Sequence, residues 1–256
     1  MKTSIGFIGG GRITKIFLEG FKNKSVKFDS IKVYEPNSET LDQLTSVYPG
    51  IIKAETPEDA AHAKMVIIAV HPPVVSDILE KIAGTIGENT LVVSLAPKIT
   101  IDKIASKLET TNIIRMIPNA TSYINDGYNP VAYHTAMHKK EKKQVNKVFK
   151  VLGKLIETDE SRLEGYAIVS AMLPTYFWFQ WKEMEAIATQ MGLSEKEAKK
   201  AVHSTLKKSL RLYYKSGLTP DEVMDLIPVK PIGENEEEIK SIFNAKLLGL
   251  YEKMKP

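Results

Sequence analysis

Short apolar runs alternate with longer helical patterns along the first 160 residues of the chain. Five Val- and Ile-rich runs have the length of a strand and lie at residues 5–8, 31–34, 65–70, 90–94 and 112–116, and two further strand-length runs lie at residues 129–134 and 155–158. Capping residues such as Thr56, followed by Pro57, and Thr100 mark helix starts between them. This alternation predicts strand–helix–strand units on a parallel sheet, and therefore a Rossmann-type, doubly wound α/β fold.

After Asp159 the pattern is helical throughout. A long apolar stretch, Leu163 to Met191, contains Pro174, which predicts a break or kink at that point. Capping boxes at Ser194 and Thr219 open two further helices, and a last amphipathic helix is expected over residues 237–253. We therefore expect a Rossmann domain over residues 1–159 and an all-helical domain over residues 160–256.

Composition excludes several classes of protein. The net charge of +4 over 256 residues comes from dispersed lysines opposed by acids, with no basic stripe of the kind that binds nucleic acid. The longest apolar run, residues 65–70, cannot span a bilayer, and no signal peptide is visible. Without cysteine there are no disulfides, thiolate metal sites or cysteine nucleophiles. We expect a cytoplasmic protein that acts on a small molecule, without nucleic acid, membrane or metal.

A glycine-rich turn follows the first predicted strand and opens a helix, as Gly9-Gly10-Gly11-Arg12-Ile13. The first glycine permits a tight turn, and the third lets backbone N–H groups approach a pyrophosphate at the helix N-terminus. Thr14 stands where the usual fingerprint has its last glycine. The position of the motif between strand and helix favours dinucleotide binding over a purely structural turn.

Glu35 ends the second predicted strand, where an acid hydrogen-bonds the adenosine ribose hydroxyls of a dinucleotide. A carboxylate there repels a 2′-phosphate, so the expected cofactor is NAD or NADP with NAD favoured. Asn37 and Ser38 are side chains that can accommodate a phosphate. A solvated loop acid is the structural alternative for Glu35.

Three further strand ends are expected to line the cofactor, because ligands of doubly wound sheets lie outside the carboxyl ends of the strands. The residues concerned are Ala69, Val70, His71 and Pro72, then Ala96, then Asn119. His71 is a candidate proton donor, with a structural loop histidine as the alternative. Asn119 either binds cofactor and substrate or caps a turn.

The run of residues 176–181 places aromatic side chains on every face of a helix. A helix that is apolar all round must be buried, and a small helical domain offers too little interior for it. This pattern predicts a subunit interface and therefore a homodimer.

These motifs together resemble the pyrroline-5-carboxylate reductase family. The resemblance rests on the glycine turn, Ala69-Val70-His71-Pro72, Arg115-Met116-Ile117-Pro118-Asn119, residues 191–198 and Lys215-Ser216-Gly217, and it covers nearly the whole chain. It implies reduction of a cyclic imine acid to proline by hydride transfer from NADPH or NADH, a step of proline biosynthesis. It also implies helical domains that intertwine into dimers or larger homo-oligomers.

The sequence departs from the family pattern in the substrate-binding segments. Where the family has Ser-Gly-Ser-Gly-Pro-Ala-Tyr, residues 170–176 read Ser-Ala-Met-Leu-Pro-Thr-Tyr. The family's Ser-Pro-Gly-Gly-Thr-Thr loop corresponds to residues 227–232, which have lost the glycines and threonines. His71 replaces the usual lysine, and Arg12 replaces the usual asparagine. The motifs of the cofactor-binding half thus follow the family pattern in general, and the motifs of the substrate pocket do not.

No catalytic residue can be assigned from these patterns. Tyr176, Thr175 and His71 are candidates, and the two hydroxyl residues are equally explained as core or interface side chains. Lys230 can offer a charge to a substrate carboxylate, or it is a solvated loop lysine. The favoured function is an NAD(P)-dependent oxidoreductase that acts on a small cyclic imine or related carbonyl compound. The alternatives are a β-hydroxyacid dehydrogenase-like enzyme and a catalytically silent dinucleotide-binding regulatory protein.

Overall fold

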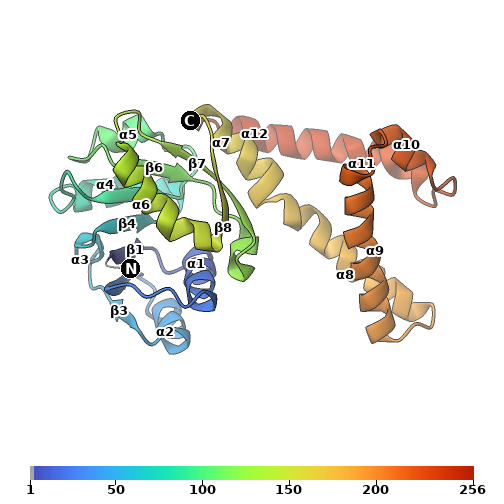
Figure 1. Cartoon of the computed structure of the whole chain (residues 1–256), viewed down its shortest axis with the longest axis horizontal. Coiled ribbons are helices and arrows are strands. Elements are labelled where there is room, and N and C mark those ends of the chain that lie inside the picture. The colour runs from blue at the N-terminus through green and yellow to red at the C-terminus, as the bar shows by residue number, and fades with distance from the viewer. Residues whose placement is uncertain (1–2) are drawn as a thin grey trace. The chain divides into compact units, whose positions relative to one another are not determined.

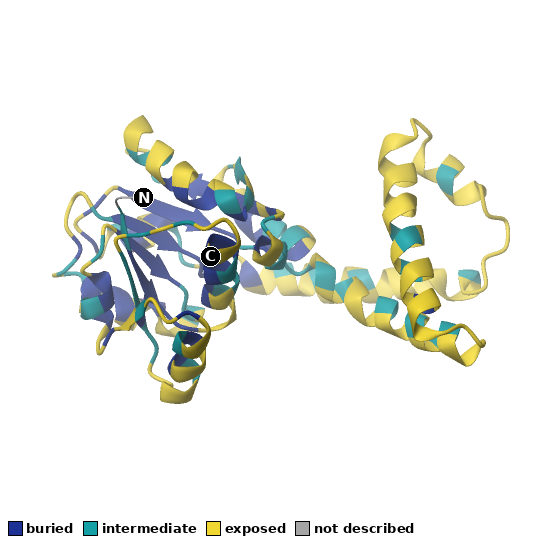
Figure 2. Cartoon of the chain, turned by 60° about the horizontal axis from the view of Figure 1, so that its bottom comes forward, coloured by how far each residue is buried: buried dark blue, intermediate teal, exposed yellow. Residues whose placement is uncertain are grey.

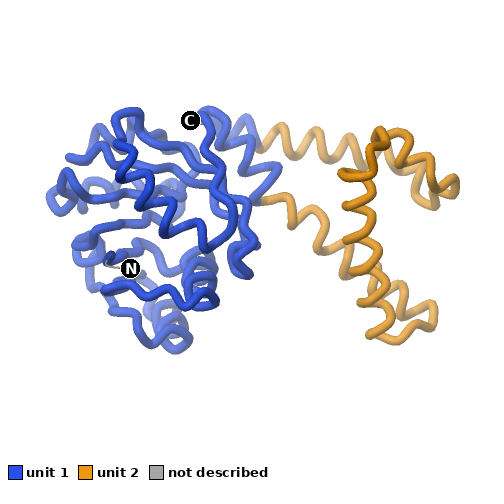
Figure 3. The backbone as a smooth tube through the Cα atoms, viewed as in Figure 1, with its two compact units in different colours: residues 1–171, 251–256 blue, residues 172–250 orange. Residues whose placement is uncertain are grey.

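The computed structural model describes residues 3–256, which form two compact units (Figure 3). The first unit runs to Ala171 and includes Tyr251–Pro256, and the second comprises Met172–Leu250. The domain boundary predicted between residues 159 and 160 stays a prediction.

The first unit is built on one eight-stranded sheet with strand order β3-β2-β1-β4-β5-β6-β7-β8 (Figure 1). The strands are β1 Ser4–Ile8, β2 Ser30–Tyr34, β3 Ile51–Lys53, β4 Met65–Ile68, β5 Leu91–Ser94, β6 Ile113–Met116, β7 Gly127–Tyr133 and β8 Gly153–Glu157. All neighbouring strands are parallel except β6 and β7. The predicted Rossmann-type fold is confirmed.

Helices lie between most of the strands and after the last one. They are α1 Arg12–Asn23, α2 Ser38–Val47, α3 Pro57–Ala61, α4 Pro72–Ile82, α5 Ile101–Ala105, α6 Lys139–Phe149 and α7 Leu163–Tyr166. Thr56 and Thr100 cap α3 and α5 through their side-chain oxygens, as predicted. All seven predicted strands are present, but the sequence did not predict β3, which has only three residues and lies at the edge of the sheet.

The core lies on both faces of the sheet, because alternate residues of a strand point to opposite sides. On one face, Phe17 of α1 and Phe149 of α6 pack edge to face at 5.7 Å between ring centroids, against Phe7 of β1. On the other face α3 comes so close that a Cβ on Gly6 would lie 1.8 Å from the carbonyl oxygen of Ala60. A glycine at position 6 is therefore required by packing.

The second unit is helical and has almost no interior. Its helices are α8 Leu173–Gln190, α9 Glu195–Lys215, α10 Pro220–Asp225 and α11 Glu236–Phe243. Helix α12 Gly249–Met254 begins in this unit, and its residues from Tyr251 onward belong to the first unit. Pro174 lies in the first turn of α8, after a π-helical segment at residues 167–171, so the predicted break is confirmed. The expected last helix is instead interrupted by a second π-helical segment at residues 244–248. Within residues 172–250, Ala198 is the one buried side chain. The helices of this unit are coloured almost entirely as exposed or intermediate in Figure 2.

Membrane-spanning helices and clusters of metal-binding side chains are both absent from the described residues. Within residues 3–256, no helix combines the length and the apolar character needed to cross a membrane. Nor does this part of the chain bring together three or more His, Cys, Asp or Glu side chains in a way that could hold a metal ion.

Candidate functional site

The glycine turn joins the end of β1 to the start of α1 at the carboxyl edge of the sheet. Gly9 has φ of +109°, a left-handed conformation that favours glycine, and a Cβ there would lie 2.7 Å from the carbonyl oxygen of Ala69. Its N–H donates to the carbonyl of Tyr34 at 2.8 Å. The turn therefore lies directly against the ends of both strands that flank β1.

Thr14 stabilises this turn in a way that the motif does not reveal. Its side chain is fully buried, and its hydroxyl donates to the carbonyl oxygen of Gly9 at 2.6 Å. The sequence showed Thr14 only as the residue that stands in place of the last glycine of the fingerprint. Ile13 packs its side chain against the core, so only its backbone faces the turn.

Gly11 leaves the first turn of α1 open. It is the N-cap residue, offers no side-chain cap, and has no heavy atom within 4 Å of where its Cβ would be. N–H groups at a helix N-terminus that lack a capping side chain are ready donors for an anion, and the helix dipole favours negative charge there. The turn thus has the space and the donors that a diphosphate needs.

Glu35 lies immediately across the turn. One carboxylate oxygen accepts the N–H of Gly10 at 2.8 Å, and the other accepts the N–H of Asn37 at 3.1 Å. Asn37 uses its side-chain oxygen to cap α2, accepting the N–H of Thr40 at 2.8 Å. Glu35 is therefore held beside the glycines, where its remaining acceptor capacity can serve ribose hydroxyls.

The end of β4 lies beside the same turn. Ala69 donates its N–H to Ile8 at 2.8 Å, and Val70 would contact a Cβ on Gly9 at 3.2 Å. His71 is the N-cap residue of α4 without a side-chain cap, and Pro72 is its first helical residue. His71 is exposed, and within residues 3–256 its ring makes no hydrogen bond.

The end of β5 is buried and polar. Ala96 is 3% exposed, and its N–H donates to the hydroxyl of Ser94 at 3.4 Å. The segment continues through Lys98, which has φ of +69°. This stretch forms the edge of the site nearest the middle of the sheet.

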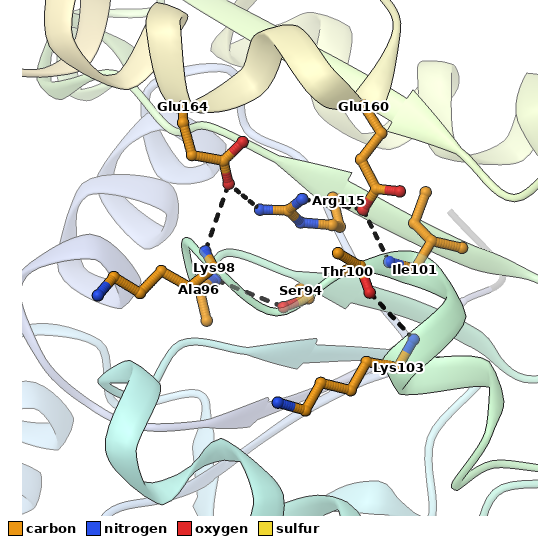
Figure 4. A network of polar contacts seen from close by, with 9 residues as sticks. All are labelled: Ser94, Ala96, Lys98, Thr100, Ile101, Lys103, Arg115, Glu160 and Glu164. Carbon is orange, nitrogen blue, oxygen red and sulfur yellow. Dashed lines mark hydrogen bonds and ion pairs between the residues drawn. The ribbon is translucent and has the colours of Figure 1, made fainter. Parts of the chain in front are cut away.

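A buried ion network holds that stretch in place (Figure 4). Arg115 of β6 is 1% exposed and donates to Glu160 at 2.8 Å and to Glu164 at 2.6 Å. The same two carboxylates accept backbone N–H groups, Glu164 from Lys98 at 3.3 Å and Glu160 from Ile101 at 2.7 Å. The sequence named Arg115 only as part of a motif. A charged residue between Ile114 and Met116 in an apolar strand was the available signal.

Asn119 follows β6 and is buried in a separate network. Its side-chain N–H₂ donates to both the carbonyl and the hydroxyl of Ser170, each at 3.2 Å. Its side-chain oxygen accepts the N–H of Thr121 at 2.9 Å, and its own N–H donates to Asn129 at 3.0 Å. Asn119 therefore caps the turn after β6 and links it to the π-helical segment. A cofactor or substrate role for Asn119 stays a prediction.

The remaining predicted residues belong to the second unit. Thr175 donates its hydroxyl to the carbonyl of Met172 at 2.7 Å, and the Tyr176 ring lies 6.3 Å from that of Phe243. Burial raises the pKa of Tyr176, so its hydroxyl stays protonated at neutral pH. Lys230 lines a largely apolar pocket of about 560 Å³ together with Tyr213 and Ile227. Their catalytic and substrate roles stay predictions.

The sheet order, the glycine turn and the acid after β2 define the class, a Rossmann-type protein with a helical C-terminal unit. Residues 4–98 match the family model described as NADP oxidoreductase, coenzyme F420-dependent. The chain is 26% identical over 243 residues to the pyrroline-5-carboxylate reductase of Escherichia coli K12, covering 94% of this chain and 90% of that protein. It is 22% identical over 253 residues to the pyrroline-5-carboxylate reductase of Corynebacterium melassecola, and the match covers 97% of this chain and 93% of that protein.

Solved structures share the fold over both units. A pyrroline carboxylate reductase of Plasmodium falciparum with NADP bound superposes with a TM-score of 0.78 at 21% identity, covering 98% of this chain and 95% of that one. The pyrroline-5-carboxylate reductase of Streptococcus pyogenes gives 0.76 at 16% identity, with 99% and 96% covered. The resemblance inferred from the motifs is confirmed along the chain.

Proposed function

We propose that the chain is an NAD(P)-dependent oxidoreductase that transfers hydride to a small cyclic imine acid or a related carbonyl compound. The observation that carries the proposal is the glycine turn. At this turn Gly11 gives the N-terminus of α1 no side-chain cap, and Glu35 accepts the N–H of Gly10. The names of the relatives support the same chemistry. Together with the cysteine-free sequence, they favour a cytoplasmic enzyme of proline biosynthesis.

The residues present fit a nicotinamide dinucleotide. The N–H groups at Gly11, Arg12 and Ile13 would hold the diphosphate, because the helix N-terminus has neither a capping side chain nor a Cβ at position 11 in the way. Glu35 would accept the ribose hydroxyls. When bound, the coenzyme supplies the hydride. The protein's part is to orient the two reactants and keep water from them.

The strand ends would line the nicotinamide half. Ala69 and Val70 lie beside Gly9, and Ala96 is fixed near the edge of β5 by the Ser94 hydroxyl. The Arg115 network holds the backbone at Lys98, so this wall of the site is rigid. Rigid walls favour hydride transfer because the reacting carbons must be held close and aligned.

For the substrate, we propose roles for Tyr176 and Lys230, which are both residues of the helical unit. An imine is readily protonated, so it needs only a weak proton donor, and a neutral tyrosine hydroxyl suffices. Lys230 would pair with a substrate carboxylate, because it lies in the segment that corresponds to the family's Ser-Pro-Gly-Gly-Thr-Thr loop and has lost the glycines of that loop. Position 231 is proline, which has no N–H to offer.

We also propose a homodimer or larger homo-oligomer formed through the helical unit. Its large apolar side chains are exposed, including Phe179 at 66% and Tyr214 at 70%. A folded segment of this size needs a buried core, and contiguous exposed apolar surface marks an interface. A second copy of the chain can bury these exposed apolar side chains.

A second candidate is a dinucleotide-binding protein without turnover. It is favoured by Asn119, whose side chain is already occupied by Ser170 and Thr121, and by the loss of both glycine segments. Such a protein would sense or report the coenzyme rather than use it.

Coenzyme oxidation with pyrroline-5-carboxylate separates these candidates. We expect the absorbance of NADPH or NADH to fall at a rate that saturates with substrate and is abolished by heat denaturation. Tight coenzyme binding with no oxidation on this substrate or a panel of cyclic imines and ketones supports the silent protein. Absence of coenzyme binding contradicts both.

A further inference from the structure

Lys98 has a backbone conformation that lysine seldom adopts. Its φ of +69° lies in the left-handed region, where a side chain crowds the backbone and glycine is favoured. Within residues 3–256, the other non-glycine residues with positive φ are Ser25 and Asn125, and each follows the end of a helical segment. Lys98 instead follows β5, at the carboxyl edge of the sheet. Backbone strain of this kind gathers at ligand-binding and active sites.

A buried network holds Lys98 in this conformation. Glu164, which is 2% exposed, accepts the Lys98 N–H at 3.3 Å and is itself bound by Arg115 at 2.6 Å. Glu160 accepts the N–H of Ile101 at 2.7 Å, so the backbone is fixed on both sides of the turn. The direction in which the Lys98 side chain leaves the backbone is therefore set by the fold.

The side chain of Lys98 takes no part in this network. Figure 4 shows it extending away from Glu160 and Glu164. In the part of the chain that the structure describes, its ammonium makes no hydrogen bond or ion pair, and both acids are already bound by Arg115. The fold thus keeps an exposed, unpaired cation at the end of β5.

The end of β5 lies on the nicotinamide side of the proposed coenzyme site. The N–H of Leu95 donates to the carbonyl of Ile68 at 3.0 Å, which joins the end of β5 to the end of β4. Glu35 follows β2, on the opposite side of β1. A dinucleotide lies across the strand ends of such a sheet, so an adenosine held by Glu35 leaves the nicotinamide toward β4 and β5. Lys98 is thus on the side of the site where a substrate meets the nicotinamide.

We propose that Lys98 determines the specificity of the site for an anionic substrate, by pairing its ammonium with the carboxylate of a cyclic imine acid. The inference rests on the proposed function and adds a recognition residue from the first unit. A carboxylate has about four acceptor positions, so Lys98 can act together with Lys230. Arg115 and Glu164 are positioning residues, since they act only through the backbone of Lys98.

Two ring compounds test this pairing without hydride transfer. Tetrahydrofuran-2-carboxylate has a five-membered ring with a carboxylate and no double bond in the ring to reduce, and its carboxamide has the same ring without the charge. Calorimetric titration of the full chain, saturated with NADH or NADPH, measures the affinity for each. We expect Lys98→Gly to bind the carboxylate on the order of tenfold more weakly than wild type, since one hydrogen bond between charged groups contributes a factor of this size. Its affinity for the carboxamide should equal that of wild type.

The choice of glycine separates the charge from the fold. Glycine suits a φ of +69° and keeps the N–H that Glu164 accepts, so Lys98→Gly should melt no lower than wild type and bind the coenzyme equally well. Lys98→Arg keeps the charge and should retain most of the affinity for the carboxylate. The matched control Lys103→Gln removes an exposed lysine from α5 and should change neither affinity.

The outcomes distinguish this inference from the proposed function. Equal affinity of wild type and Lys98→Gly for the carboxylate, or an equal loss of affinity for the carboxamide, overturns the inference and leaves the proposed function standing. A wild-type protein that binds the coenzyme and not the carboxylate overturns the inference as well. Failure of both NADH and NADPH to bind overturns the proposed function, and the inference with it.

Discussion

Thr14 has a specific structural role at the glycine turn. Its hydroxyl donates to the carbonyl of Gly9, and both groups are buried or enclosed by the turn. A carbonyl that loses a buried donor costs about 1–3 kcal/mol. The hydroxyl thus fixes the backbone that presents the open N–H groups.

Replacing Thr14 with valine should lower the free energy of unfolding by about 1–3 kcal/mol and weaken coenzyme binding. Thr14→Ser keeps the hydroxyl and should retain most of the binding. Urea denaturation and coenzyme titration measure the two effects. Equal coenzyme affinity in the valine and wild-type proteins would show that the bond does not shape the turn.

Tyr133 gives the stability a dependence on alkaline pH. Burial, with Glu157 nearby, raises the pKa of Tyr133 to about 12, whereas an unfolded tyrosine ionises near 10. Its contribution to stability is therefore complete below pH ~10 and is lost as the pH rises toward about 12. In urea titrations, Tyr133→Phe should lose less stability than wild type over this interval. Parallel pH profiles would contradict this assignment.

At the scale of elements, the Arg115 network joins β6, the stretch before α5 and the segment that holds Glu160 and Glu164 (Figure 4). Removing one partner of a buried ion pair leaves an uncompensated charge, at a cost of about 3–5 kcal/mol. Arg115→Met should destabilise the first unit by this amount in urea. Adding Glu164→Gln should restore part of the loss, because the isolated charge is removed. No recovery in the double variant would argue against a paired buried charge.

The sequence predicted those elements whose signals are local. The strands at residues 5–8 and 65–70 follow from apolar runs, and Ser194 and Thr219 form the predicted capping boxes. β3 was missed because three residues at a sheet edge carry too little pattern. The π-helical segments at residues 167–171 and 244–248 have no signal in hydrophobic periodicity.

The candidate site was likewise predictable where its signals are local in sequence. Glu35 was correctly placed at the end of β2, and the structure puts it against the glycine turn. The contacts of Thr14 and Arg115 depend on partners that are distant in sequence or lie in the backbone, so no local motif displays them. The pocket beside the glycine turn, which Arg12 and Lys15 line together with residues of α2, likewise depends on the approach of that helix.

At the scale of the whole molecule, the helical unit lacks a core of its own, since Ala198 alone is buried within residues 172–250. Light scattering should therefore give at least twice the chain mass of 28.6 kDa. Phe179→Asp should lower that mass or make the melting temperature depend strongly on protein concentration, as expected for linked association and folding. Lys143→Asp on α6 is the control, since Lys143 is also exposed but lies outside the helical unit. A wild-type monomer at all concentrations would contradict the proposed assembly.

The central claim is that the uncapped N-terminus of α1 holds a coenzyme diphosphate, and Gly11→Asp tests it most directly. Aspartate is a favourable N-cap residue and has free space at this position, so the variant should be as stable as wild type or slightly more so. Its carboxylate would take the N–H groups and repel the diphosphate. In calorimetry with NADH and NADPH, wild type should bind and Gly11→Asp should not, whereas Gly84→Asp, another glycine with free space around it, should bind as wild type does. A stable Gly11→Asp protein that binds either coenzyme normally would contradict the account.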